Sequence, residues 1–239
     1  MAMGPERGYL NTARTDVGQI DVGLRRYMLS VYNYMAGGLA VTGVIALLIA
    51  SSPSLQMAIW GSPLRYVAIL APVAVVFFFS FRIQKMSFGA AQLTYWIYAA
   101  LMGLSLSFIF LAYTGTSIAR VFFITAGTFA AMSLYGYTTR RDLTGMGSFL
   151  FMGLIGIILA GLVNIFIQST ALQFAISVIG VIVFVGLTAY DTQKIKEWYV
   201  ANDDGATMGK KAIFGALNLY LDFINLFLML LRLFGSSRS

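Results

Sequence analysis

Seven long apolar runs, separated by short polar segments, dominate the amino-acid sequence. They cover residues 29–50, 64–81, 93–113, 118–137, 147–167, 172–190 and 213–234. Each run is about 20 residues long, which is enough for a helix to cross a hydrocarbon core of about 30 Å. Because the runs lack the alternation of barrel strands, helices are the elements that would satisfy their backbone in lipid. The pattern therefore predicts an all-α membrane protein with seven transmembrane helices.

Polar segments frame this predicted bundle at both ends. Residues 1–27 form a polar leader, residues 28–235 contain the seven spans, and residues 236–239 form a short tail. The first span follows Arg25 and Arg26 and is longer than the apolar core of a signal peptide. We therefore expect an uncleaved leader that continues directly into the first span.

The composition supports the bilayer as the main solvent. Hydrophobic residues make up 59% of the 239 residues and charged residues only 10%, too few to cover a water-soluble body of this size. The sequence contains no cysteine and no histidine, which excludes disulfides, thiolate metal sites and imidazole bases. Any proton chemistry must therefore fall to carboxylates, and we expect no bound cofactor.

Basic residues are divided unequally between the two sides of the predicted membrane. Of the 16 lysines and arginines, all lie on the leader's side except Arg65, Arg120, Arg232 and Arg238. The positive-inside rule then places the amino terminus in the cytoplasm and the carboxyl terminus outside. Since this bias also explains the net charge of +7, we expect no nucleic-acid partner.

Small residues recur at helical spacing in the fifth and sixth runs. Gly153, Gly156 and Ala160 share one face of the fifth, and Gly180 and Gly186 lie in the sixth. Lipid offers no hydrophobic drive for helix association, so membrane helices pack where small side chains let their backbones approach. We expect these positions to be packing sites rather than ligand sites.

The last apolar run carries polar residues on one face of its helix. Spacings of four and three place Asn218, Asp222 and Asn225 on a single stripe. A carboxylate at mid-helix costs about 2.5 to 3.5 kcal/mol in the bilayer, so Asp222 should face protein or water. Such a carboxylate is typical of an ion or proton pathway, although a neutral Asp222 that only hydrogen-bonds to a neighbour would also fit.

Asp191 is the other acidic residue inside, or at the edge of, an apolar run. It could pair with Asp222, or only with Lys194 or Lys196 at the membrane interface. At about 1.5 Å per residue, Asp191 lies roughly 5 Å below the interface and Asp222 roughly 16 Å. The two carboxyl groups would meet only if their helices were staggered or tilted.

Two segments resemble the bacterial branch of the Bax inhibitor-1 family. One is the short segment Ala189-Tyr190-Asp191, and the other is the longer run Asn218-Leu219-Tyr220-Leu221-Asp222-Phe223-Ile224-Asn225-Leu226-Phe227. The resemblance extends over all seven spans, from the region of Arg25 to the end of the chain. It implies a bundle in which six helices surround a central seventh, and a pH-sensitive calcium leak channel or transporter.

The resemblance also implies roles for individual residues. Asp191 and Asp222 match a proton-sharing pair of the family, and their oxygens would be transient ligands of calcium. Arg82, which follows Phe81 at the end of the second apolar run, matches an arginine that latches onto this pair. Some members carry an acidic residue in the third helix where this chain has Met102, so we expect no further cation site there.

Elementary electrostatics supports a switch at two neighbouring carboxylates. At low dielectric both cannot easily ionise, so we expect Asp191 and Asp222 to share a proton. The ionised pair would offer hard oxygen ligands for calcium and a bidentate partner for Arg82. We therefore hypothesise that acidification loosens the Arg82 contact and opens the cytoplasmic end, with Asn218 and Asn225 supporting the polar stripe.

Two other functions fit parts of the sequence. Intramembrane aspartyl proteases also place aspartates on neighbouring helices, but Asp222 follows Leu219-Tyr220-Leu221 rather than their Gly-x-Gly, so we do not expect an enzyme. A non-conducting regulator would instead bind other membrane proteins or a quality-control protease, through the leader or residues 202–207. Under each function the expected setting is a lipid bilayer, and that of the bacterial inner membrane in particular.

Overall fold

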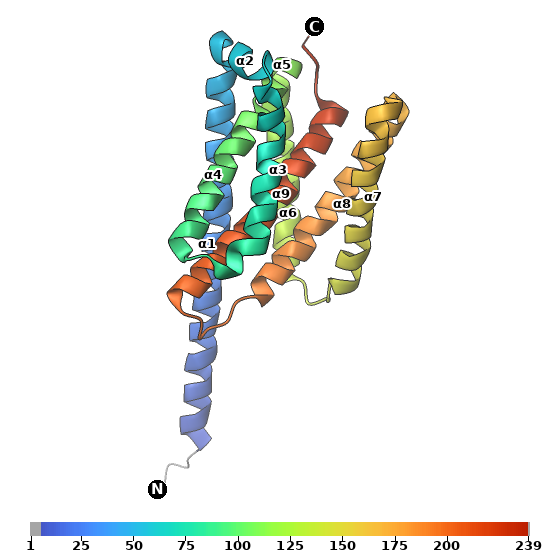
Figure 1. Ribbon diagram of the computed structural model, residues 1–239. Coiled ribbons are helices and arrows are strands. Elements are labelled where there is room, and N and C mark those ends of the chain that lie inside the picture. The colour runs from blue at the N-terminus through green and yellow to red at the C-terminus, as the bar shows by residue number, and fades with distance from the viewer. Residues whose placement is uncertain (1–5, 239) are drawn as a thin grey trace.

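The computed structural model describes residues 6–238, and their side chains from residue 22 onward. Figure 1 shows a bundle of long helices from which the amino-terminal part of α1 projects. The elements in chain order are α1 (Glu6–Ala50), α2 (Pro53–Trp60), α3 (Leu64–Arg82), the 3-10 helix η1 (Ile83–Lys85), α4 (Phe88–Leu106), α5 (Ile109–Ala112), α6 (Gly115–Thr138), α7 (Thr144–Ile167), α8 (Thr170–Glu197) and α9 (Gly205–Phe234).

Within residues 6–238, seven helical segments are long and apolar enough to cross a membrane, which confirms the predicted class and number of spans. The first is the part of α1 from Val22, the second joins α3 to η1, and the third joins α4 to α5. The third span is interrupted near Ser107, whose hydroxyl oxygen accepts a hydrogen bond from Trp60 Nε1 at 3.0 Å. Residues from Glu6 onward in the predicted leader are helical and continuous with the first span.

Four helices begin at a side chain that caps the first turn. The oxygens of Ser87, Thr114, Ser169 and Asp204 accept hydrogen bonds from backbone N–H groups at the starts of α4, α6, α8 and α9, respectively. The first N–H groups of a helix have no partner within the helix, so each cap satisfies one of them. These caps explain why the helices begin a few residues outside the apolar runs.

Asp204 allows a direct test of one such cap. Its Oδ1 atom accepts a hydrogen bond of 2.5 Å from the Thr207 backbone N–H, and this bond lowers the pKa of the exposed carboxyl below its ordinary value. The stabilisation is therefore present at neutral pH and is lost as the pH falls below about 4. We expect Asp204→Ala to lower the thermal midpoint in detergent at neutral pH, and the difference from wild type to shrink in acid. A difference that persists unchanged in acid would contradict this assignment.

The core of the protein follows α9, the most deeply buried of the seven spans. Its main contacts are with α1, α4, α6 and α8, whereas α3 packs mainly on α4, and α7 on α8. The expected ring of six helices around a central seventh is therefore not confirmed. We use the term basic end for the end of the bundle where α3, α6 and α8 finish and α9 starts, which carries Arg82 and Lys211; it is the lower end in Figure 1.

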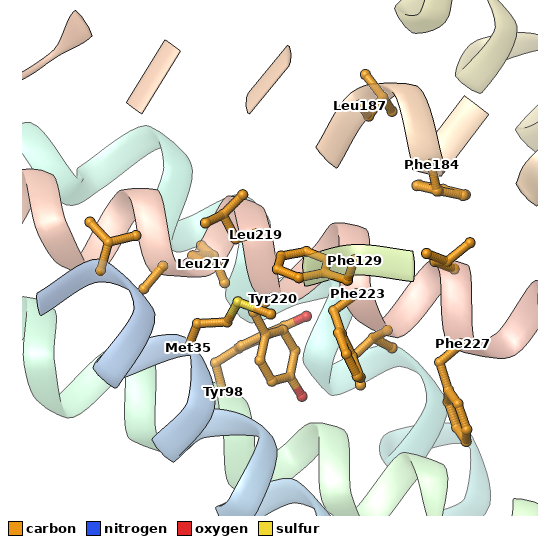
Figure 2. Packing of buried hydrophobic residues seen from close by; sticks show 14 of the residues in the cluster. Met35, Tyr98, Phe129, Phe184, Leu187, Leu217, Leu219, Tyr220, Phe223 and Phe227 are labelled. Carbon is orange, nitrogen blue, oxygen red and sulfur yellow. The ribbon is translucent and has the colours of Figure 1, made fainter. Parts of the chain in front are cut away.

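Aromatic side chains fill the space around α9. Figure 2 shows Tyr98 beside Tyr220, with ring centroids 5.5 Å apart, and Phe129 beside Phe223, with centroids 5.6 Å apart. Thr42 of α1 donates a hydrogen bond to the Ala99 carbonyl at 2.8 Å, so the Tyr220 hydroxyl must be the donor in its own 2.7 Å contact with Thr42. One polar cluster thus joins α1, α4 and α9 in the middle of the bundle.

The carboxyl-terminal tail returns to the junction between α5 and α6. The Ser236 N–H donates to the Ser117 hydroxyl at 2.8 Å, and the Ser236 carbonyl accepts from the Thr114 N–H at 3.0 Å. An isolated β-bridge pairs Tyr113 with Ser237, and the described residues form no longer strand. The end of α9 is therefore fixed to the start of α6 at the end of the bundle opposite the basic end.

Candidate functional site

Close packing between α8 and α9 brings the two membrane aspartates together. A Cβ atom on Gly215 of α9 would lie 2.9 Å from Ile195 Cγ2, and a Cβ on Gly180 of α8 would lie 2.9 Å from Met229 Cγ. Both distances are shorter than a normal carbon contact, so a larger residue at either position would force the facing side chain to move. Asp191 and Asp222 lie between these two contacts.

Asp191 and Asp222 line one cavity of about 550 Å³ between α7, α8 and α9. Each carboxyl group lies within hydrogen-bonding reach of the other. The sequence placed the two aspartates at different depths in the membrane, but the packing of α8 against α9 brings their side chains to the same cavity. Asn218 and Asn225 line the same cavity, so the whole polar stripe of α9 faces it.

The hydrogen bonds available to Asp191 and Asp222 limit which protonation states the pair can adopt. Asp222 is only 5% exposed, and its Oδ2 atom is buried without a donor among the described residues. An ionised carboxylate can only accept hydrogen bonds, so a bond between Asp191 and Asp222 requires a proton on one of them. Asn225 Nδ2 donates to the Leu221 carbonyl at 2.8 Å, which leaves the Asn225 side-chain oxygen as an acceptor.

The structure does not bring Arg82 to the aspartates. Arg82 ends α3 with an exposed side chain and is not among the residues that line their cavity. The two ion pairs among the described side chains are Lys194–Glu197 at 2.9 Å and Lys211–Asp203 at 2.5 Å, both toward the basic end. The latch assigned to Arg82 therefore stays a prediction.

The third wall of the cavity comes from α7, which the sequence did not single out. Leu154 and Ile157 of α7 line it, and so does Tyr190, the neighbour of Asp191 on α8. A Cβ on Gly147 would lie 2.4 Å from the Tyr190 ring, so this glycine makes room for the tyrosine. Gly147, at the start of the fifth apolar run, was the only hint in the sequence that another side chain packs there. Nothing in the sequence identified that side chain as Tyr190.

The cavity offers few side-chain oxygens that could hold a metal ion. Calcium usually takes about six to eight oxygen ligands, and the side-chain oxygens among the lining residues are those of two carboxyl groups, two amides and the Tyr190 hydroxyl. The described residues contain no cluster of three or more acidic or otherwise metal-binding side chains. A calcium ion held by these residues would therefore need water to complete its shell.

Comparisons with known proteins cover nearly the whole chain. The family model described as "Inhibitor of apoptosis-promoting Bax1" matches residues 24–239. The Escherichia coli protein named "Inner membrane protein YbhL" is 51% identical over 90% of this chain and 94% of its own length. An uncharacterized protein of Rickettsia prowazekii, RP147, is 51% identical over 91% and 92%, and one of Caulobacter vibrioides is 44% identical over 97% and 98%. The chain is therefore a multi-pass membrane protein that belongs to the Bax inhibitor-1 family.

Proposed function

We propose that the protein is a pH-sensitive calcium leak channel or transporter, with Asp191 and Asp222 as its proton-sensing pair. The observation that supports this function best is the shared cavity, in which two carboxyl groups from different helices lie within hydrogen-bonding reach. Intramembrane carboxyl groups that face a cavity are typical of ion and proton pathways. The amide oxygens of Asn218 and Asn225 extend the row of hard ligands along α9.

In this proposal a proton and a cation compete for the same oxygens. The ionised pair attracts calcium or a guanidinium group, and the singly protonated pair holds either one less tightly. The gain or loss of one proton therefore changes both how tightly the aspartate pair binds calcium and how tightly it binds Arg82. The same chemistry makes calcium the substrate and protons the regulator.

In this proposal Arg82 reaches the aspartate pair through a movement of α3 toward α8 and α9. Its neighbour Ile83 lines a second cavity together with Trp198, which is about 10 Å along α8 from Asp191. Such a movement would have to displace α3 along α4, the helix on which it mainly packs.

We also propose an orientation and a location for this function. The basic end would face the cytoplasm, since it carries most of the lysines and arginines and the positive-inside rule favours that side. The likeness to an Escherichia coli inner membrane protein supports the bacterial inner membrane. Calcium would then cross between the cytoplasm and the space outside this membrane.

Purified protein in liposomes that contain a calcium-sensitive dye tests the function directly. Between about pH 8 and about pH 5 we expect calcium flux to rise as the pH falls, because protonation releases the latch, by up to about tenfold per pH unit, the limit for a one-proton switch. Protein-free liposomes provide the baseline at each pH. Absence of protein-dependent flux at every pH would contradict the proposal and favour a non-conducting regulator. Cleavage of a helical reporter peptide that depends on both aspartates would instead favour the protease.

A further inference from the structure

Another large cavity lies between α1 and α6, and none of its lining residues belongs to α7. Both helices pack on α9, but they do not form one of the principal helix pairs with each other. The space between them, toward the basic end, has a volume of about 610 Å³. Its wall includes Arg25, Met28 and Tyr32 from α1, and Ala130, Ser133 and Tyr137 from α6.

The polar groups at the back of this α1–α6 cavity are already paired within the protein. Thr192 Oγ1 donates to the Thr188 carbonyl at 2.7 Å, so in its 3.0 Å contact with Ser133 the serine must be the donor. The Tyr32 hydroxyl must then donate to Ser133, at 2.7 Å. With these hydrogens used internally, the cavity presents an almost entirely apolar wall to an occupant, which favours a hydrocarbon chain.

The position and length of the α1–α6 cavity match one leaflet of a bilayer. Arg25 and Tyr32 are about 10 Å apart along α1, and the lining part of α6, from Phe129 to Tyr137, rises by about 12 Å. One leaflet of the hydrocarbon core is about 15 Å deep. At the rim, Leu29 and Leu134 are 50% and 63% exposed, so the cavity opens sideways to the region where lipid chains lie.

The mouth of the α1–α6 cavity is positively charged. Arg25 is exposed there, and Tyr137 stands on the opposite side, where Lys196 Nζ donates to its backbone carbonyl at 2.8 Å. Tyrosine, arginine and lysine are the side chains that typically anchor at the headgroup level. The described lining residues include no carboxylate, so the charge at the mouth complements an anionic headgroup.

From the apolar wall, the depth of one leaflet and the basic mouth, we infer that the α1–α6 cavity binds one phospholipid with an anionic headgroup. One acyl chain lies between α1 and α6, and the headgroup phosphate contacts Arg25. The inference does not depend on calcium conduction, because it concerns a different face of the bundle from the aspartates.

Native mass spectrometry of the purified protein with added lipid tests this site. We expect one tightly bound phosphatidylglycerol, preferred about fivefold over phosphatidylcholine with the same chains, which is the factor expected for one arginine at an anionic headgroup. Ala130→Trp fills the cavity and should abolish the bound lipid. Ala131→Trp is the matched control, because Ala131 is also exposed on α6 but does not line the cavity. Arg25→Gln should keep a bound lipid but lose the headgroup preference.

Three results would overturn the inference. The first is equal lipid retention by Ala130→Trp and wild type, with Ala131→Trp unchanged. The second is a headgroup preference that survives Arg25→Gln. The third is a lipid-free dimer that dissociates in Ala130→Trp, which would make a second copy of the chain the occupant. Equal thermal midpoints of the two tryptophan variants serve as the control for folding.

Discussion

Asp222→Asn is expected to abolish the pH dependence of calcium flux without unfolding the protein. The amide has nearly the shape of the carboxyl group, and the buried side chain keeps its place between α8 and α9. Arg82 then has only one carboxylate to bind, so the latch that protonation would release is already weakened at every pH. Flux that changes by up to about tenfold per pH unit in wild type should become flat between about pH 8 and about pH 5. Liposome flux at each pH is the measurement.

The matched control is Asp142→Asn, the same chemical change in an exposed carboxylate between α6 and α7. This variant should keep the pH dependence of wild type, since Asp142 is not among the residues that line the cavity. If Asp222→Asn conducts calcium with an unchanged pH dependence, Asp222 is not part of the switch.

Gly136→Ala should destabilise the protein more than any other alanine substitution of a helical glycine. A Cβ atom at this position of α6 would lie 2.1 Å from the Ala189 carbonyl oxygen of α8, so the two backbones would have to separate. Overpacking in a well-packed interior costs about 1 to 3 kcal/mol, and a collision with backbone should reach the upper part of that range. Because Ala189 is close to Asp191, the shift should also disturb the aspartate cavity. The midpoint of thermal unfolding in detergent is the measurement.

Gly127→Ala in the same helix is the control for helix propensity. No atom lies within 4 Å of a Cβ built at Gly127, so this change should leave the thermal midpoint unchanged or raise it slightly. Equal thermal midpoints for the two variants would show that α6 and α8 are not held at this contact.

The sequence was sufficient to predict the seven spans and the polar stripe of α9, because both depend on patterns of neighbouring residues. Apolar runs of the right length predicted all seven spans, and a period of three to four residues placed Asn218, Asp222 and Asn225 on one face of α9. The relation between Asp191 and Asp222 could not be fixed, since it depends on how two helices cross. That crossing depends on contacts such as Gly215 against Ile195, whose partners lie on different helices.

The packing of small residues was predicted with partial success. Gly180 and Gly186 are close contacts as expected, against Met229 and Leu150 respectively, but the expectation for Gly156 was wrong, because no atom lies within 4 Å of a Cβ there. The tightest contact with a backbone atom, at Gly136, was missed. The spacing of glycines shows which face of a helix carries small residues, but it does not show which face packs against another helix. The separation of α1 from α6, and with it the lipid cavity, depends on the same three-dimensional information.

The most direct test of the central claim is the calcium flux of the Asp191→Asn/Asp222→Asn double variant beside each single variant, measured across the same pH range. If the two carboxyl groups act as one proton-sharing unit, each single variant already removes the pH dependence. The double variant should then add nothing, because groups that act as a unit are strongly non-additive. If each single variant removes only part of the pH dependence and the double variant removes the sum, the aspartates titrate independently and do not form a proton-sharing pair.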